Sequence, residues 1–91
     1  MNFSYEPNKI FAINGGGEII AEVTFPEVKD NVVNINHTFV DPTLRGQGVA
    51  SLLLQEAYQT IKNQNKKAIM TCSYAVKWFE QHTECSDILS K

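Results

Sequence analysis

Residues 40–54 read VDPTLRGQGVASLLL, and the rest of the chain is organised around them. Asp41-Pro42 ends an extended segment, Arg45 to Gly48 form a glycine-rich turn, and the apolar spacing from Val49 onward is typical of a helix. The first turn of a helix has unpartnered backbone N–H groups and the positive end of the helix dipole, so it attracts anions. Glycines let a phosphate approach this backbone closely, and Arg45 adds a fixed positive charge. The stretch therefore predicts a diphosphate-binding turn.

Two common phosphate loops are excluded by their spacing. The dinucleotide loop needs GxGxxG and the Walker A loop needs GxxxxGK[ST], and neither occurs here. The stretch instead contains Arg45-x-x-Gly48-x-Ala50, between an apolar strand pattern and an amphipathic helix pattern. A nucleotide-binding protein is therefore the least favoured function, and an ordinary strand-to-helix turn is the structural alternative.

The composition describes one small globular domain spanning residues 1–91. The chain is 43% hydrophobic and 20% charged, which is usual for a globular protein. Its net charge of -2 argues against nucleic acid as the main ligand, because nucleic-acid-binding domains are usually basic. It has neither an apolar run long enough for a membrane span nor a signal-peptide pattern, so we expect a cytoplasmic protein.

The cysteines do not predict a metal site. Cys72 and Cys85 are the only two cysteines, and their separation is not a metal-ligand spacing. We expect both to be reduced in the cytoplasm and no metal to be bound.

The hydrophobic pattern predicts an α+β fold with an antiparallel hairpin, a third strand, a crossover helix and a fourth strand parallel to the third. The third strand should carry Val33, Ile35, His37 and Phe39 on one face. Ser73 is expected to cap the second helix. In chain order we expect a lead-in 1–8, strand 9–13, turn 14–17, strand 18–25, connection 27–31, strand 32–40, helix 48–63, strand 67–71, helix 74–81 and tail 82–91.

The first predicted helix has an apolar stripe at the i, i+3, i+4 spacing. Leu54 and Tyr58 widen this stripe, and Lys62 in the last turn suits the negative end of the helix dipole. The stripe consists of Val49, Leu52, Leu53, Glu56, Ala57, Thr60 and Ile61.

A second group of polar residues follows the fourth predicted strand. Ligands of strand–helix–strand units bind at the carboxyl ends of the strands, so residues 38–44 and 71–74 should face one another. Cys72 then lies at a helix N-terminus, which favours the thiolate form. The sequence thus predicts a thiol close to the anion-binding turn.

The loop resembles the coenzyme A pyrophosphate loop of the GNAT acetyltransferases, whose pattern is [QR]-x-x-G-x-[GA]. The resemblance implies that acetyl-CoA binds, that two strands splay apart, and that backbone near 38–40 hydrogen-bonds the pantetheine arm. The implied cofactor-binding residues are Thr38, Phe39, Val40, Arg45, Gly46, Gln47, Gly48, Val49, Ala50, Cys72 and Tyr74.

The chain is further similar to the small cysteine-containing GNAT-like acetyltransferases over roughly residues 8–89. The shared features are His37-Thr38-x-Val40, Gly46-x-Gly48-Val49-Ala50, Cys72-x-Tyr74 and a late His82. The resemblance implies transfer of the acetyl group to an amine, with Cys72 as candidate acetyl acceptor in a two-step route. We expect a monomer or weak dimer. The acceptor is an unidentified amine or a protein.

The chain departs from the family pattern at several positions. Phe79 stands where many GNAT enzymes have a tyrosine that protonates the departing thiolate, and Thr83 and Cys85 differ from the small group. The helices that usually follow the first strand have no room, because Ile13 and Glu18 are separated only by a turn. These departures leave a non-catalytic CoA-binding module or sensor as the alternative function. Direct attack by the amine would instead need a base, for which His37 and Glu22 are weak candidates.

Most of these side chains also have ordinary structural roles. Cys72 could line the cleft without reacting or be a buried apolar residue. Tyr74 could contact pantetheine or close the core. The structural reading is preferred for His37 on the sheet, His82 at a helix C-terminus, Trp78 and Phe79 in the core, and Cys85 as incidental.

Overall fold

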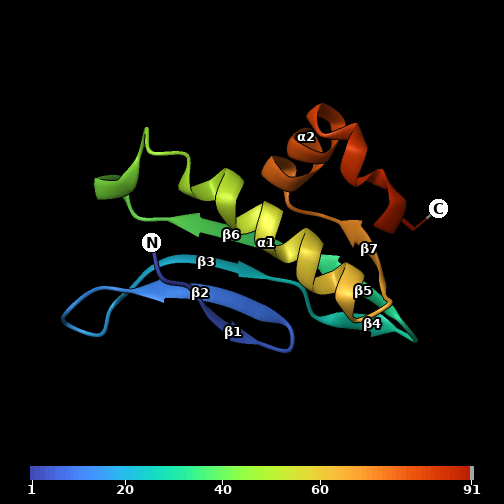
Figure 1. Ribbon diagram of the computed structural model, residues 1–91, viewed down its shortest axis with the longest axis horizontal. Helices are drawn as coiled ribbons and strands as arrows, with labels where there is room; N and C mark the ends of the chain where they lie inside the picture. Colours follow the sequence, from blue (N-terminus) through green and yellow to red (C-terminus); the bar gives the residue numbers. More distant parts are fainter. Residues whose placement is uncertain (91) are drawn as a thin grey trace.

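The computed structural model of the protein describes residues 1–90 and has the expected α+β architecture (Figure 1). All strands form one layer, and the two α-helices lie together on one side of it (Figure 1). The elements are β1 (Ser4–Glu6), β2 (Lys9–Ile13), β3 (Ile19–Thr24), β4 (Glu27–Lys29), β5 (Val32–Ile35), β6 (His37–Val40), η1 (Pro42–Leu44), α1 (Val49–Asn63), β7 (Lys67–Met70), α2 (Ser73–Gln81) and η2 (Thr83–Ile88).

The expected N-terminal hairpin is the centre of a four-stranded antiparallel sheet with the order β1-β2-β3-β6. The Asn14 side chain closes the β2–β3 turn by accepting hydrogen bonds from the N–H groups of Gly16 and Glu18. Ala21 and Val23 are fully buried against the helices, so Glu22 between them points to the opposite face of the sheet.

The predicted strand 32–40 is wrong as a single element, because it breaks at Asn36. β5 pairs in parallel with β7, as expected for the third and fourth strands, whereas β6 leaves this sheet and pairs antiparallel with β3. The burial phase also shifts by one residue at the break. Val33 and Ile35 are buried, whereas His37 and Phe39 are exposed, so the four residues do not share a face.

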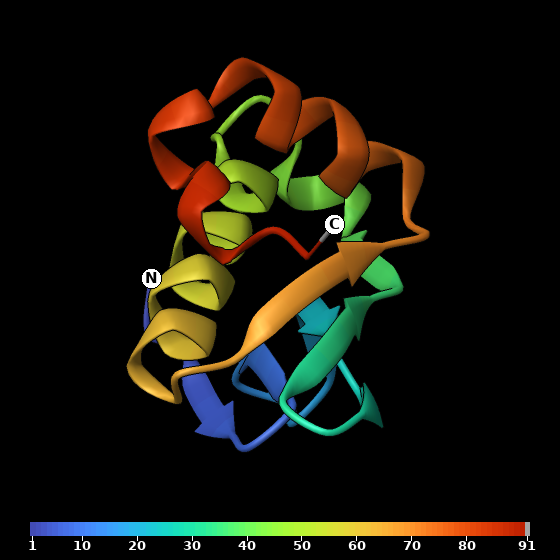
Figure 2. The ribbon, with the colours of Figure 1, turned by 90° about the vertical axis from the view of Figure 1, so that its right-hand side faces the viewer.

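The break separates β6 from β7, and no strand pairing joins these two among the described residues. The Ile35 carbonyl accepts hydrogen bonds from the N–H groups of Thr71 and Cys72, both at 3.2 Å. The end of β7 is therefore held to β5, while β6 continues along β3. Figure 2 shows β7 running beside β5, with α1 to the left of the strands and α2 above them.

The core lies between the sheets and the helices and includes residues of both sheets and both helices. On α1, Leu54 and Tyr58 are buried together with Leu53, but Leu52 is 48% exposed. Leu52 was expected in the apolar stripe, so the buried face is rotated slightly toward Leu54 and Tyr58. Tyr58 also hydrogen-bonds Asp87 (2.8 Å), which ties η2 to the helix.

Four further expectations need correction. The lead-in 1–8 contains β1, and the connection 27–31 contains β4, because short polar strands at a sheet edge lack an apolar signal. Ser73 is the first residue of α2, and Cys72 is its N-cap. The tail contains η2, whereas Lys91 lies outside the described residues.

Within residues 1–90, no helix is both long enough and apolar enough to span a membrane. Because α1 and α2 pack on the same side, no helix of the described part of the chain covers the other face of the four-stranded sheet (Figure 1).

Candidate active site

The link between β6 and α1 is ordered by Asp41. Its carboxylate accepts hydrogen bonds from the N–H (2.9 Å) and the hydroxyl (2.8 Å) of Thr43. These two bonds lower the pKa of Asp41, since both favour the ionised form. Asp41 thereby caps η1 and fixes where the glycine-rich turn begins.

The turn depends on two glycines with left-handed backbone conformation. Gly46 has φ 82° and Gly48 has φ 73°, which other residues adopt only at a cost. Gly48 is the N-cap of α1, and no side chain caps this end. The N–H groups of the first turn therefore remain available to an external acceptor, as a phosphate-binding helix end requires.

A pocket of about 280 Å³ opens beside this helix end. Apolar side chains form much of it, and the glycine backbone and the exposed Arg45 form the polar part. The lining residues are Val40, Leu44, Arg45, Gly46, Gly48, Val49, Ala50 and Tyr74. Seven of these eight residues belong to the predicted cofactor-binding set; only Leu44 was missed, since no motif distinguishes it from a core leucine.

Four residues of the predicted set do not line the pocket: Thr38, Phe39, Gln47 and Cys72. Thr38 pairs in register with the buried Val23, so its side chain lies on the helix side of the sheet. Phe39 pairs with Glu22 and lies on the opposite face, 37% exposed.

Cys72 lies beside Thr38 at the N-terminus of α2. Its thiol is partly buried and is 3.6 Å from Thr38 Oγ1, a hydrogen-bond distance for sulfur. Burial raises the pKa of Cys72, but hydrogen bonds from the Ala75 N–H, the Thr38 hydroxyl and the Tyr74 N–H outweigh it, and the net pKa is lowered. The predicted thiolate character of this helix-capping cysteine is thus supported by its hydrogen bonds.

His37 is on the uncovered face of the sheet and not in the pocket. Its Nε2 is 3.7 Å from Glu22 Oε1, and 53% of its side chain is exposed. Neighbouring residues of β6 alternate between faces, so His37 and the Cys72 partner Thr38 lie on opposite sides of the strand. The structure therefore brings the two candidate bases, His37 and Glu22, together, but on the other side of β6 from the thiol.

The remaining aromatic residues divide into core and surface. Trp78 and Phe79 are buried, as preferred from the sequence, and Trp78 Nε1 donates to Ser51 Oγ (2.8 Å), which joins α2 to α1. His82 is the C-cap of α2; its Nδ1 is 2.7 Å from the Trp78 carbonyl oxygen, and its ring stacks on the indole. Tyr74 does not close the core but is 43% exposed at the pocket.

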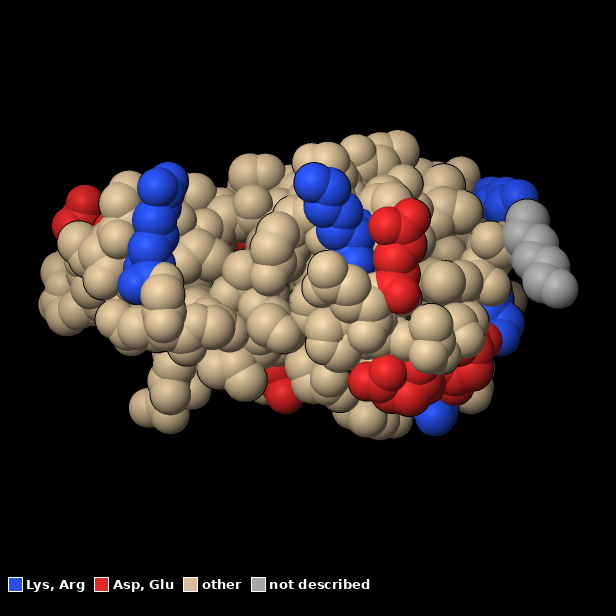
Figure 3. All heavy atoms as spheres, turned by 90° about the horizontal axis from the view of Figure 1, so that it is seen from above, with Lys and Arg blue, Asp and Glu red and all other residues tan. Residues whose placement is uncertain are grey.

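Charge on the helix side is sparse. Viewed from above, the lysine and arginine side chains lie apart from one another, and those of residues 1–90 form no continuous basic patch on this face (Figure 3). An anionic ligand at the pocket would thus depend on the helix end and Arg45, not on a broad positive field.

Comparison with protein families identifies this architecture. Residues 10–88 match the family of the GCN5-related N-acetyl-transferases. The chain belongs to this family. As a member, the protein is an N-acetyltransferase with an unidentified acceptor, and its family uses acetyl-CoA as acetyl donor.

Solved structures of GCN5-related N-acetyltransferases share the fold. The solution structure of a GCN5-like candidate N-acetyltransferase from Staphylococcus aureus is 30% identical, with a TM-score of 0.81, covering 98% of this chain and 87% of that one. The crystal structure of an acetyltransferase from Bacillus cereus is 23% identical to this chain, with a TM-score of 0.66. The match includes 81% of this chain and 54% of the B. cereus chain.

Rv2747 from Mycobacterium tuberculosis, solved in complex with CoA, is 14% identical to this chain, with a TM-score of 0.65. The match includes 84% of this chain and 47% of the Rv2747 chain. At such low identity, the Rv2747 and B. cereus structures support the fold alone. The chain spans about half the length of these two proteins. No curated protein matches it significantly.

Proposed function

We propose that this N-acetyltransferase binds acetyl-CoA at the glycine-capped end of α1 and presents the acetyl group to Cys72. In this arrangement the N–H groups of Gly46 to Ala50 bind the pyrophosphate, and Arg45 adds charge. The observation that carries the proposal is the uncapped N-terminus of α1 beside a pocket that β6 helps to line, together with a Cys72 thiol of lowered pKa that contacts Thr38 on the same strand.

The pantetheine arm would lie along β6. This strand ends its sheet and pairs only with β3 among the described strands, so its other edge can exchange backbone hydrogen bonds with a ligand. Phe39 and Val40 would contribute backbone groups, while the Phe39 side chain points away. Val40 and Tyr74 both line the pocket and would contact the arm.

The favoured chemistry uses Cys72 as an acetyl carrier. Its thiolate attacks the thioester carbonyl carbon, the bond from this carbon to the CoA sulfur breaks, and the CoA thiolate leaves. A primary amine then attacks the acetyl-cysteine, an N–C bond forms, and the Cys72 thiolate leaves while the nitrogen loses a proton. Both steps exchange an acyl group without oxidation or reduction.

A non-catalytic CoA-binding module is the second candidate, and Phe79 favours it. Its ring is 3% exposed and has no hydroxyl that could protonate a departing thiolate. The β2–β3 connection is a short turn, so this part of the chain supplies no acceptor-binding helix.

Acetyl labelling separates these functions. The protein is incubated with radiolabelled acetyl-CoA, with and without cell extract, and analysed by intact mass. We expect Cys72→Ala to abolish labelling of the protein while CoA binding is retained, and Cys85→Ala to label like the wild type because Cys85 is buried. Unchanged labelling of the Cys72→Ala variant would exclude the covalent route. CoA binding without labelling of protein or extract would establish the binding module.

A further inference from the structure

The link between β7 and α2 consists of two residues, Thr71 and Cys72, because β7 ends at Met70 and α2 begins at Ser73. The register of the parallel β5–β7 pair also ends here, with Ile35 opposite Met70. Strand pairing therefore does not hold the two residues of the link. The place of the Cys72 thiol depends on the contacts that hold them instead.

Asn34 on β5 supplies two of these contacts with its side chain. Its Oδ1 accepts hydrogen bonds from the Thr71 N–H and from the Thr71 hydroxyl, both at 3.2 Å. The Thr71 N–H also donates to the Ile35 carbonyl oxygen, which accepts the Cys72 N–H as well, each at 3.2 Å. The link is thus attached to β5 through one side-chain oxygen and one backbone oxygen.

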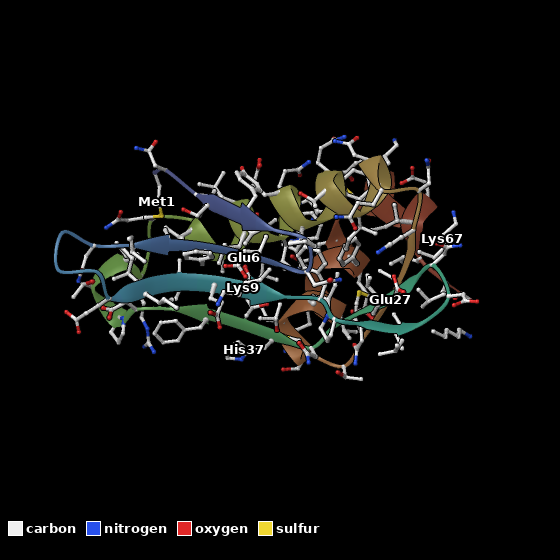
Figure 4. All side chains as sticks on the ribbon, turned by 90° about the horizontal axis from the view of Figure 1, so that it is seen from below. Met1, Glu6, Lys9, Glu27, His37 and Lys67 are labelled. Carbon is white, nitrogen blue, oxygen red and sulfur yellow. The ribbon has the colours of Figure 1, made fainter. Side chains whose placement is uncertain are left out.

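The Asn34 side chain lies on the face of β5 that is turned away from the helices. Both of its sequence neighbours are fully buried in the core, and successive side chains of a strand point to opposite faces. Figure 4 looks at the sheets from this outer side, where Glu27 on β4 and Lys67 on β7 mark the two neighbours of β5.

The bonds to Asn34 keep the Thr71 side chain on this outer side, where it is exposed. Cys72 is the next residue and points the other way, so that its sulfur is partly buried and 3.6 Å from Thr38 Oγ1 on β6. A link held outward at Thr71 therefore holds the thiol inward, against β6.

The residue type at position 34 fits this role. Asparagine is depleted in strands, where β-branched residues are favoured, so strand formation does not explain it. Its amide oxygen instead binds a neighbouring segment as a backbone carbonyl would, and it does so where the strand pairing has ended. Asn36, two residues later, accepts a hydrogen bond from the Thr24 hydroxyl on β3 and provides a matched asparagine that does not contact the link.

We propose that Asn34 is a positioning residue of the acetyl transfer, which acts through Thr71 to hold the Cys72 thiol where the acetyl group arrives. This inference rests on the proposed function, in which Cys72 is the acetyl carrier. Asn34 does not line the pocket at the glycine turn, so its loss should affect the reaction and not the binding of acetyl-CoA.

The first test is the rate at which acetyl-CoA acetylates Cys72, followed by intact mass over a range of acetyl-CoA concentrations. We expect Asn34→Ala to lower the rate at saturation about tenfold and to leave the half-saturating concentration unchanged, because the reacting thiol is misplaced. Asn34→Asp keeps an oxygen that accepts both hydrogen bonds and should restore most of the rate. Asn36→Ala loses a comparable bond to β3 and should react like the wild type.

Two variants of Thr71 keep the inference testable if Asn34→Ala does not fold. Thr71→Val removes the hydroxyl bond to Asn34 and keeps the N–H bond, whereas Thr71→Ser keeps both. We expect the valine variant to react severalfold more slowly than the serine variant.

The second test needs no acetyl-CoA and follows alkylation of Cys72 by iodoacetamide across a pH series. The Tyr74 and Ala75 N–H groups that favour the thiolate belong to the same helix end as Cys72, whereas the Thr38 hydroxyl belongs to β6. Within residues 1–90, no charged side chain is among the groups that shift this pKa. A displaced link would therefore lose the contact with Thr38, so we expect the alkylation profile to move to higher pH in Asn34→Ala and to stay in place in Asn36→Ala.

Three results would overturn the role of Asn34: wild-type acetylation and alkylation in Asn34→Ala, equal slowing in Asn34→Ala and Asn36→Ala, or an Asn34→Asp variant as slow as Asn34→Ala. If the wild type is acetylated in these cases, the proposed function stands and only this inference is lost. A wild type that is not acetylated, combined with an alkylation profile displaced only in Asn34→Ala, would remove the carrier role of Cys72 and retain the hold of Asn34 on the thiol.

Discussion

At the scale of single residues, the two cysteines have opposite surroundings. Burial raises the pKa of Cys85, and the nearby carboxylates of Glu84 and Asp87 raise it further. For Cys72, hydrogen bonds to the sulfur more than offset the effect of burial and lower the pKa. We therefore expect iodoacetamide to modify Cys72 first. As the pH is raised, the alkylation rate of Cys72 should increase at pH values below the ordinary pKa of a thiol. Cys85 should react only at pH values above the ordinary thiol pKa. Mass spectrometry of peptides from a series of pH values measures both reactions.

The Thr38 hydroxyl contributes to this difference. Removing it in Thr38→Val takes away one hydrogen bond that favours the thiolate, so the pKa of Cys72 should rise and its alkylation at neutral pH should slow about two- to threefold. Thr38→Ser keeps the hydroxyl and serves as the matched control. Equal alkylation rates in the valine and serine variants would show that Thr38 does not tune the thiol.

The candidate role of a residue could be predicted from the sequence where the residue belongs to a local motif. Gly46, Gly48 and Arg45 were recognisable by spacing, and Cys72 by its place between a strand and a helix. The faces of His37 and Phe39 were not predictable, because a one-residue shift at Asn36 reverses the alternation that the prediction used. That shift arises from pairing with two different sheets, which is a long-range effect.

At the scale of elements, the glycine turn depends on a left-handed backbone conformation at Gly46 and Gly48. An added Cβ at Gly48 would meet nothing within 4 Å, so Gly48→Ala tests the backbone conformation and not packing. Because φ is 73°, we expect a loss of about 1 kcal/mol in the free energy of unfolding, measured in urea, together with weaker binding of CoA. Gly15→Ala is the control, since its φ is not left-handed and its surroundings are equally open. An equal loss in both variants would contradict the role given to Gly48.

The helices and the main strands followed from periodicity, but the edge strands did not. α1 and α2 have strong apolar faces, whereas β1 and β4 are short and polar and exist because β2 and β5 offer them an edge. The division into two sheets likewise depends on tertiary pairing at Ile35 and Asn36.

At the scale of the whole molecule, a small core carries the stability. Leu53 is fully buried, whereas its neighbour Leu52 on the same helix is 48% exposed. Leu53→Ala should therefore cost about 3 kcal/mol of unfolding free energy, and Leu52→Ala less than about 1 kcal/mol. Urea unfolding of both variants measures the difference, and similar losses would show that α1 is rotated relative to the structure described above.

The most direct test of the whole account is an amide chemical-shift titration of the intact chain with acetyl-CoA. We predict that the largest shifts occur at Gly46, Gly48 to Ala50 and the backbone of residues 38–40, with a smaller change at Cys72. The contradicting result is saturable binding that leaves the glycine turn unshifted and moves amides elsewhere, or no binding at all.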